Sequence, residues 1–173
     1  MCLACISDDW HPPVRDDYVV LQRRDDDCGL AAITTLLRLA GTRIGYDEVA
    51  RGIAIGELGL TLREMSRITA RWGVATEAYH VNRQSGWINT RTPGWIALLG
   101  MARLGHYVVV RNVVADTVFV YDPKEGRRAM KRDRFEAEWT GYALLPVNET
   151  PNLTRRAGPP PENSVFRRPG SAR

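Results

Sequence analysis

The hydrophobic pattern of this 173-residue chain changes at Gly73, and that change constrains the fold more than any other feature of the sequence. Before Gly73, apolar residues recur at the spacing of amphipathic helices. After it, short runs rich in β-branched and aromatic residues are separated by turn residues. Helices followed by a series of strands are typical of the α+β class, in which helices pack against an antiparallel sheet. We therefore predict an α+β fold.

Three helices are predicted before the change. The first covers residues 28–40, where apolar residues follow helical spacing, and a second, weaker one covers 46–54. The third opens with a capping-box pattern, Thr61 to Glu64, in which each side chain can satisfy a backbone amide at the helix start. This third helix is expected to end at Gly73.

Strands are predicted after the change, in this order: 74–81, 95–99, 107–110, 117–121 and 142–147. Residues 112–116 are the expected hairpin connection between the third and fourth strands. Residues 122–126 form a turn by their own chemistry, because proline fixes φ and glycine tolerates the reversal. A short helix is predicted at 132–139.

The domain is predicted to span residues 18–147. Residues 1–17 form a polar, proline-interrupted N-terminal arm, and residues 148–173 form a tail dominated by Pro, Arg, Gly and Ser. Such a composition cannot bury enough apolar surface to offset the entropy of ordering, so we expect the tail to be disordered.

The charge pattern argues against a nucleic-acid-binding protein. The net charge is +4, but acidic residues are interleaved with the basic ones. That arrangement indicates a solvated face with some preference for acidic partners. The densest basic cluster is short and consists of Arg127, Arg128, Lys131, Arg132 and Arg134.

The cysteines and apolar runs bear on cofactors and location. Three cysteines (Cys2, Cys5 and Cys28) are too few for a disulfide scaffold, and Cys2 with Cys5 lacks the second pair that a tetrahedral metal site needs. No cofactor is predicted. The chain has no signal-peptide pattern and no apolar stretch near the roughly 20 residues needed to cross a bilayer. We predict a cytoplasmic protein without a membrane span of its own.

Four residues, in chain order, form a candidate active site: Gln22, Cys28, His106 and Asp122. A thiolate can attack a carbonyl, an imidazole can take and return protons, a carboxylate can orient that imidazole, and an amide can help bind the oxyanion. Each residue also has an ordinary structural explanation. A lone cysteine is usually a small buried hydrophobe, a histidine in a strand can be a hydrogen-bonded core residue, and aspartate before proline is common turn chemistry. The combination in this order indicates a cysteine hydrolase.

The surroundings of Cys28 favour and oppose a thiolate at once. The start of a helix stabilises negative charge, whereas the three aspartates Asp25–Asp27 disfavour a second anion. We predict that Asp27 caps the helix and points away from the sulfur, and that a His106 imidazolium stabilises the thiolate. If the strands that hold His106 and Asp122 form a hairpin, the two residues lie near the same end and can hydrogen-bond.

The sequence resembles the peptidase C39 family, the papain-like cysteine peptidases that remove double-glycine leader peptides from bacteriocins and related secreted peptides. The resemblance covers about residues 18–147. The matching segments are 21–32 with 36–37 and Gly41, the helix start 59–62, the strand 106–110, the Asp-Pro turn 121–126, and the closing positions Phe135 and 139–141.

The resemblance implies a role for each of the four residues. Cys28 is the nucleophile, His106 is the general acid/base, Asp122 orients His106, and Gln22 with the Cys28 backbone amide forms the oxyanion hole. It also implies a papain-like fold and a narrow cleft that accepts glycine just before the cut.

The implied partner is a peptide precursor whose leader helix docks in a shallow apolar groove. Trp87 and Trp95 are candidates for lining that groove, with core packing as the favoured role of either. Family members are commonly domains of ABC exporters, and this chain has neither membrane spans nor a nucleotide-binding loop. A role in export is therefore left to a separate ABC exporter.

Three hypotheses follow, in decreasing order of weight. The first is a cysteine endopeptidase that cuts after a double-glycine motif in the precursor of a secreted peptide. The second is a papain-like domain that acts on another amide or acyl substrate. The third is a non-catalytic leader-binding module associated with an exporter.

Overall fold

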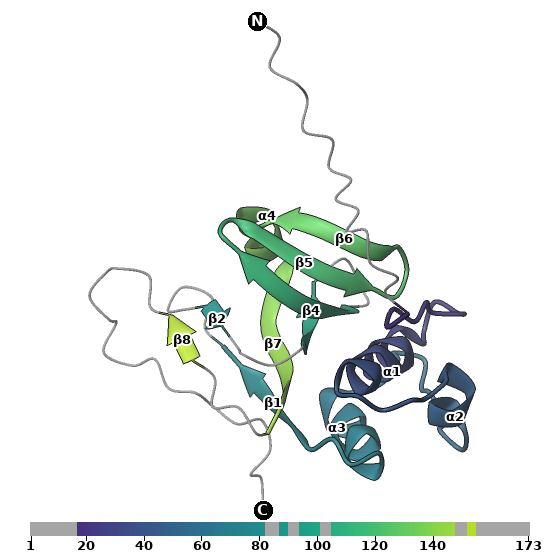
Figure 1. Ribbon diagram of the computed structural model, residues 1–173. Helices are drawn as coiled ribbons and strands as arrows, with labels where there is room; N and C mark the ends of the chain where they lie inside the picture. Colours follow the sequence, from purple (N-terminus) through teal and green to yellow (C-terminus); the bar gives the residue numbers. More distant parts are fainter. Residues whose placement is uncertain (1–16, 82–86, 90–93, 101–104, 148–151, 155–173) are drawn as a thin grey trace, which may run out of the picture.

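The fold consists of a helical layer packed against an antiparallel sheet (Figure 1). The computed structural model describes residues 17–81, 87–89, 94–100, 105–147 and 152–154. Helices α1 (Cys28–Leu39), α2 (Tyr46–Ala50) and α3 (Leu62–Arg71) come first in the chain and lie together beside the sheet. The predicted α+β class is confirmed.

The main sheet has six strands in the order β1-β7-β3-β4-β5-β6, and all neighbours are antiparallel. The strands are β1 (Thr76–His80), β3 (Trp95–Leu99), β4 (His106–Val114), β5 (Thr117–Asp122), β6 (Gly126–Lys131) and β7 (Trp139–Pro146). A separate pair consists of β2 (Trp87–Asn89) and β8 (Asn152–Thr154). The short helix α4 (Arg132–Glu138) joins β6 to β7.

Alternate residues of β4 serve two hydrophobic clusters, one on each face of the sheet. Val109 packs in the cluster formed with α1 and α3, whereas Val108 and Val110 pack in the cluster that contains Phe135 of α4. This alternation is the two-residue period of a strand. Trp95 belongs to the second cluster, with rings of Phe135 and Trp139 6.4 and 5.5 Å away. Core packing is therefore its role, as the sequence favoured.

The first and third helices form as their local chemistry predicts. Every residue of α1 from Cys28 to Leu37 is buried, so this helix lies at the centre of the molecule. At the start of α3, the backbone amide of Glu64 donates to Thr61 Oγ1 (3.3 Å), and the amide of Thr61 donates to Glu64 Oε2 (2.8 Å). The predicted capping box is confirmed.

Several predicted boundaries are wrong. The second helix ends at Ala50, four residues early, and the expected connection 112–116 is largely strand. Only Ala115 and Asp116 join β4 to β5, and Ala115 takes the left-handed conformation (φ 49°) that such a tight turn demands. The strand β6 was not predicted at all, because its sequence, GRRAMK, lacks alternating apolar residues.

The predicted N-terminal arm, except Asp17, lies outside the described residues, as do Cys2, Cys5 and most of the predicted tail. Within that tail, Asn152–Thr154 form β8, which differs from the disorder predicted for these three residues. The side chain of Trp87 is also outside the described part of the structure.

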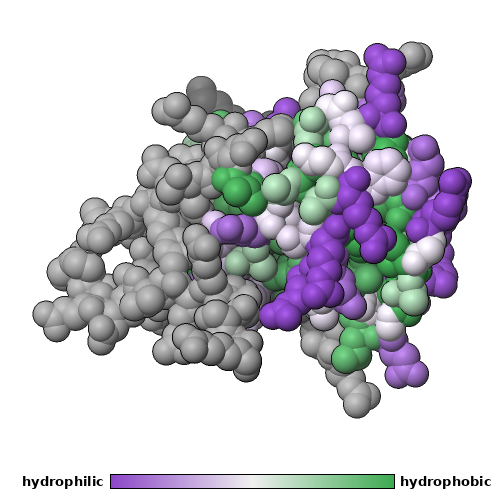
Figure 2. All heavy atoms as spheres, turned by 90° about the horizontal axis from the view of Figure 1, so that it is seen from below, coloured by the Kyte–Doolittle hydropathy of each residue, from purple (hydrophilic) through white to green (hydrophobic). Residues whose placement is uncertain are grey.

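No helix in the described ranges is long and apolar enough to cross a membrane. Seen from below, hydrophilic and hydrophobic side chains are intermixed on the described surface (Figure 2). Large exposed apolar side chains are dispersed over several elements and include Leu21, Leu58, Trp72, Val114 and Tyr142.

Candidate active site

Cys28 is the first residue of α1, where the sequence predicted the helix to begin. Its side chain is a free thiol and the residue is 8% exposed. The next residue packs closely, since a Cβ on Gly29 would lie 3.3 Å from Leu60 Cβ, a tight approach, and 3.6 Å from Tyr107 Cδ2, an ordinary contact. Glycine therefore lets the helix start approach both β4 and the segment before α3.

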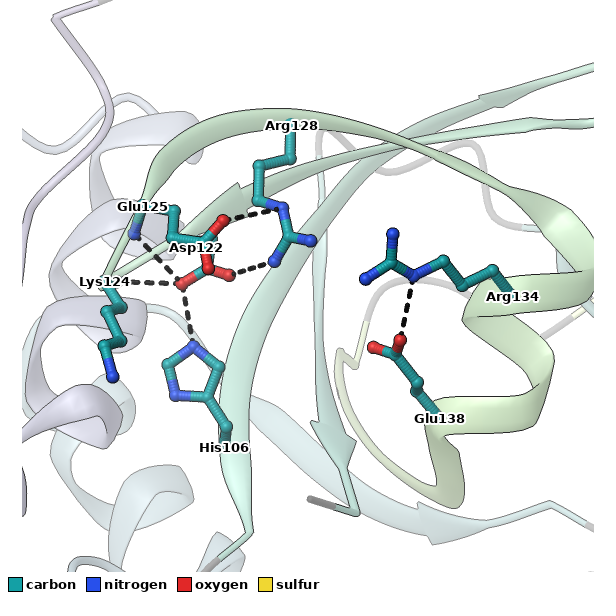
Figure 3. A network of polar contacts seen from close by, with 7 residues as sticks. All are labelled: His106, Asp122, Lys124, Glu125, Arg128, Arg134 and Glu138. Carbon is teal, nitrogen blue, oxygen red and sulfur yellow. Dashed lines mark hydrogen bonds and ion pairs between the residues drawn. The ribbon is translucent and has the colours of Figure 1, made fainter. Parts of the chain in front are cut away.

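His106 and Asp122 come together at one end of the β4–β5 hairpin. His106 opens β4 and Asp122 closes β5, and the antiparallel register that pairs Val109 with Tyr121 brings them to the same end. His106 Nε2 lies 2.7 Å from Asp122 Oδ1. The strands form the hairpin, and the hydrogen bond predicted for that case between His106 and Asp122 is present. Figure 3 shows the second ring nitrogen directed away from Asp122.

The electrostatics connect His106 to both neighbours. Burial alone would lower the pKa of His106, but hydrogen bonds to Asp122 and Cys28, together with their negative charge, raise it to about 9. Because Nε2 is bound to Asp122, the nitrogen that serves the Cys28 sulfur is Nδ1. His106 therefore lies between a thiol and a carboxylate.

Asp122 is held by three further contacts in a site where the residue is only 2% exposed. Oδ1 accepts the backbone amides of Lys124 (2.8 Å) and Glu125 (3.4 Å), and Oδ2 accepts Arg128 Nη1 (3.0 Å). Arg128 Nε also pairs with Glu125 Oε2 (3.2 Å). Burial would raise the pKa of Asp122, but the hydrogen bonds from His106, Lys124 and Arg128 lower it to about 2, so the group is a carboxylate.

Gln22 lies in the loop that leads to Cys28, and this loop is attached to the turn that follows Asp122. The backbone amide of Gln22 donates to Pro123 O at 2.7 Å. The side-chain Nε2 donates to Arg24 O at 2.9 Å, which uses one of its two hydrogens and leaves the other for a further acceptor. Oε1 is buried and has no hydrogen-bond partner among the described residues.

The prediction for Asp27 is partly wrong. Asp27 occupies the N-cap position of α1, but its side chain makes no capping hydrogen bond. Its oxygens instead accept the backbone amide of Arg23 (3.1 Å) and the hydroxyl of Tyr46 (2.6 Å). Asp27 is 1% exposed, and it fixes the loop 22–27 against α2 rather than the helix end. Asp26 pairs with Arg24 (3.0 Å), so two of the three aspartates have partners of their own.

One aromatic residue, Tyr107, and one basic residue, Arg128, also lie around Cys28, His106 and Asp122. Burial and the charges of Cys28 and Glu64 raise the pKa of Tyr107 to about 12, so its phenol is neutral beside the thiol. Tyr107 and Arg128 were not singled out by sequence reasoning. Arg128 had been placed in a solvated basic cluster, and no local pattern marks its contact with Asp122.

Among the described residues, no group of His, Cys, Asp or Glu is arranged to hold a metal ion.

The raised pKa of His106 predicts a pH-dependent stability. A group whose folded-state pKa (about 9) exceeds its ordinary value (6.5) contributes stability below pH 6.5 and loses it as the pH rises through 9. We expect the free energy of unfolding, from urea titrations, to fall by on the order of 3 kcal/mol from this group over that window. His106→Gln should remove the fall, and His80→Gln, at an exposed strand end, should retain it. A flat profile in the wild type would contradict the coupling.

A family model described as Peptidase C39 family matches residues 16–151. Among curated relatives, the probable functional amyloid protease FapD of Pseudomonas fluorescens is 25% identical over 139 residues, which cover 76% of this chain and 61% of that protein. The lactococcin-G-processing and transport ATP-binding protein LagD of Lactococcus lactis subsp. lactis is 26% identical over 130 residues, which cover 74% of this chain and 18% of that protein. The chain thus spans less than two thirds of either relative.

Two solved structures have the same fold. One is a double glycine motif protease from an AMS/PCAT transporter in complex with the leader peptide, with a TM-score of 0.63 at 18% identity, covering 73% of this chain and 88% of that one. The other is the peptidase domain of Streptococcus ComA, with a TM-score of 0.62 at 20% identity, covering 73% of this chain and 94% of that one. These likenesses confirm the papain-like α+β fold.

Proposed function

The chain belongs to the peptidase C39 family, and we propose that it is a cysteine endopeptidase that cleaves a precursor peptide after a double-glycine motif. The observation that carries the proposal is the position of His106, hydrogen-bonded to the Cys28 thiol on one side and to the Asp122 carboxylate on the other. A module that only binds leaders has no use for an imidazole held between a thiol and a buried carboxylate.

In the proposed mechanism, the Cys28 thiolate attacks the carbonyl carbon of the second glycine. The peptide bond to the next residue then breaks, and His106 gives a proton to the leaving amine. Asp122 holds the imidazolium during this step. Gln22 Nε2, which has one hydrogen left beyond its bond to Arg24 O, and the Cys28 amide stabilise the oxyanion that forms when the thiolate attacks. Water, activated by His106, hydrolyses the acyl-enzyme.

Recognition of a leader needs apolar surface near the thiol. The segment that leads to Cys28 and the loop before α3 each carry an exposed leucine. Leu21 is 54% exposed next to Gln22, and Leu58 is 83% exposed. The Leu58 loop lies against the loop 22–27, because a Cβ on Gly59 would be 3.2 Å from Asp26 O. We assign these leucines to contacts with the precursor. A cytoplasmic location, beside a separate ABC exporter, is part of the same proposal.

The proposal predicts a cleavage specificity. The purified full chain should cut a synthetic peptide, consisting of an amphipathic helical leader, Gly-Gly and a short following segment, directly after the second glycine. A matched peptide with Gly-Ala should also be cut, and one with Val-Val should not, because a narrow cleft excludes branched side chains. Mass spectrometry of the products locates the cut. Equal cleavage of all three peptides, or cleavage elsewhere, would exclude the double-glycine assignment and leave another amide as the substrate.

A further inference from the structure

Arg128 is connected to the proposed catalytic residues through Asp122. It lies on β6, opposite Val120 of β5, so its side chain is on the face of the hairpin that carries Asp122 two residues along. Arg128 Nη1 contacts Asp122 Oδ2 (3.0 Å), the oxygen that does not face His106. Figure 3 shows the chain of contacts from Glu125 through Arg128 and Asp122 to His106.

The two oxygens of Asp122 therefore have separate partners. Oδ1 serves His106 and the turn amides, while Oδ2 receives a charged donor. A buried carboxylate with a donor at one oxygen only can rotate, and the uncovered oxygen carries the cost of desolvation. A guanidinium at Oδ2 removes both problems, because it fixes the plane of the carboxylate and keeps it ionised.

Arg128 is itself held in place. Its side chain is 23% exposed, and its Nε pairs with Glu125 Oε2 at 3.2 Å. Asp122, Arg128 and Glu125 all lie within the β5–β6 hairpin and its turn, so the strand register sets their relative positions. The titratable side chains around His106 are then Cys28 from α1 and Asp122 from β5, and Arg128 from β6 lies one contact further away.

We propose that Arg128 is a positioning residue for catalysis, which fixes the Asp122 carboxylate so that Oδ1 faces His106 Nε2. The inference rests on the proposed peptidase function. Arg128 touches neither the Cys28 thiol nor the His106 imidazole, and it acts on both only through the orientation of Asp122.

The test compares three variants on the Gly-Gly peptide. Arg128→Met, which keeps the length of the side chain but loses its donors and charge, should lower kcat about 10- to 100-fold with KM within about twofold. Arg128→Lys keeps a charged donor and should recover most of the loss. Arg134→Met is the matched control, because it breaks an Arg–carboxylate pair with Glu138 (3.0 Å) on α4, apart from the Asp122 network (Figure 3), and should behave as wild type.

A second readout needs no peptide. The rate at which iodoacetamide alkylates Cys28 reports the thiolate paired with His106, and we expect this rate to fall in Arg128→Met and not in Arg134→Met. If the wild type cuts no double-glycine peptide but the alkylation rates differ as stated, the proposed substrate is wrong and the role of Arg128 stands.

Three outcomes would overturn the inference. The first is a folded Arg128→Met with wild-type kcat and alkylation rate, and the second is an equal loss in Arg134→Met. The third concerns folding: if Arg128→Met is unfolded by circular dichroism, Arg128→Gln replaces it, and failure of both variants to fold would make the role of Arg128 structural.

Discussion

Replacing Cys28 by alanine is expected to abolish peptide cleavage, with a loss in kcat on the order of 10⁶-fold, because the substitution removes the proposed nucleophile. The fold should persist. The residue is 8% exposed at the first position of α1, and alanine is the best helix former. The loss of one buried atom should lower the free energy of unfolding by only about 1 kcal/mol.

The measurement is a single-turnover assay on the Gly-Gly peptide, with circular dichroism to verify the fold. The chain offers matched controls, since Cys2→Ala and Cys5→Ala remove the other two thiols and should leave kcat unchanged. Iodoacetamide at neutral pH should block the wild type, and peptide mapping should place the label on Cys28. Cleavage that survives in Cys28→Ala would remove this residue from the mechanism, while retained leader binding without thiol reactivity in the wild type would favour a binding module.

The parts of the fold that local chemistry determines could be predicted from the sequence. Helix α1 and the capping box of α3 depend on residues within one or two turns, and β3 is a short apolar run bounded by Gly94 and Gly100. The position of His106 at the head of β4 follows from the strand-forming residues after it. These assignments needed no knowledge of tertiary contacts.

The parts that depend on pairing over distance could not be predicted. In β6 only Met130 is buried, so the strand exists because β5 supplies its hydrogen-bonding partners. The contact of Arg128 with Asp122 depends on that same register. Asp27 was also mispredicted for this reason. Its neighbours in the sequence suggest a helix cap, but its carboxylate binds the Tyr46 hydroxyl, 19 residues away in the chain.

Replacing Asp122 by asparagine is expected to lower kcat by about 10³- to 10⁴-fold, less than the loss in His106→Ala. The amide oxygen of asparagine can still accept from His106 Nε2, so the ring keeps a partner. The negative charge that helps raise the pKa of His106 to about 9 is lost, so the imidazolium is destabilised. Asp133→Asn, at an exposed position on α4, is the matched control and should retain wild-type kcat.

The donors around Asp122 make this substitution more damaging than loss of charge alone. Both oxygens accept hydrogen bonds, from His106 and the turn amides at Oδ1 and from Arg128 at Oδ2. An amide nitrogen at Oδ2 would face the Arg128 guanidinium, donor against donor. Adding Arg128→Met to Asp122→Asn should therefore cost less than the sum of the two single losses. A loss as large as that of His106→Ala would assign the acid a further role, and wild-type kcat would show that Asp122 does not orient His106.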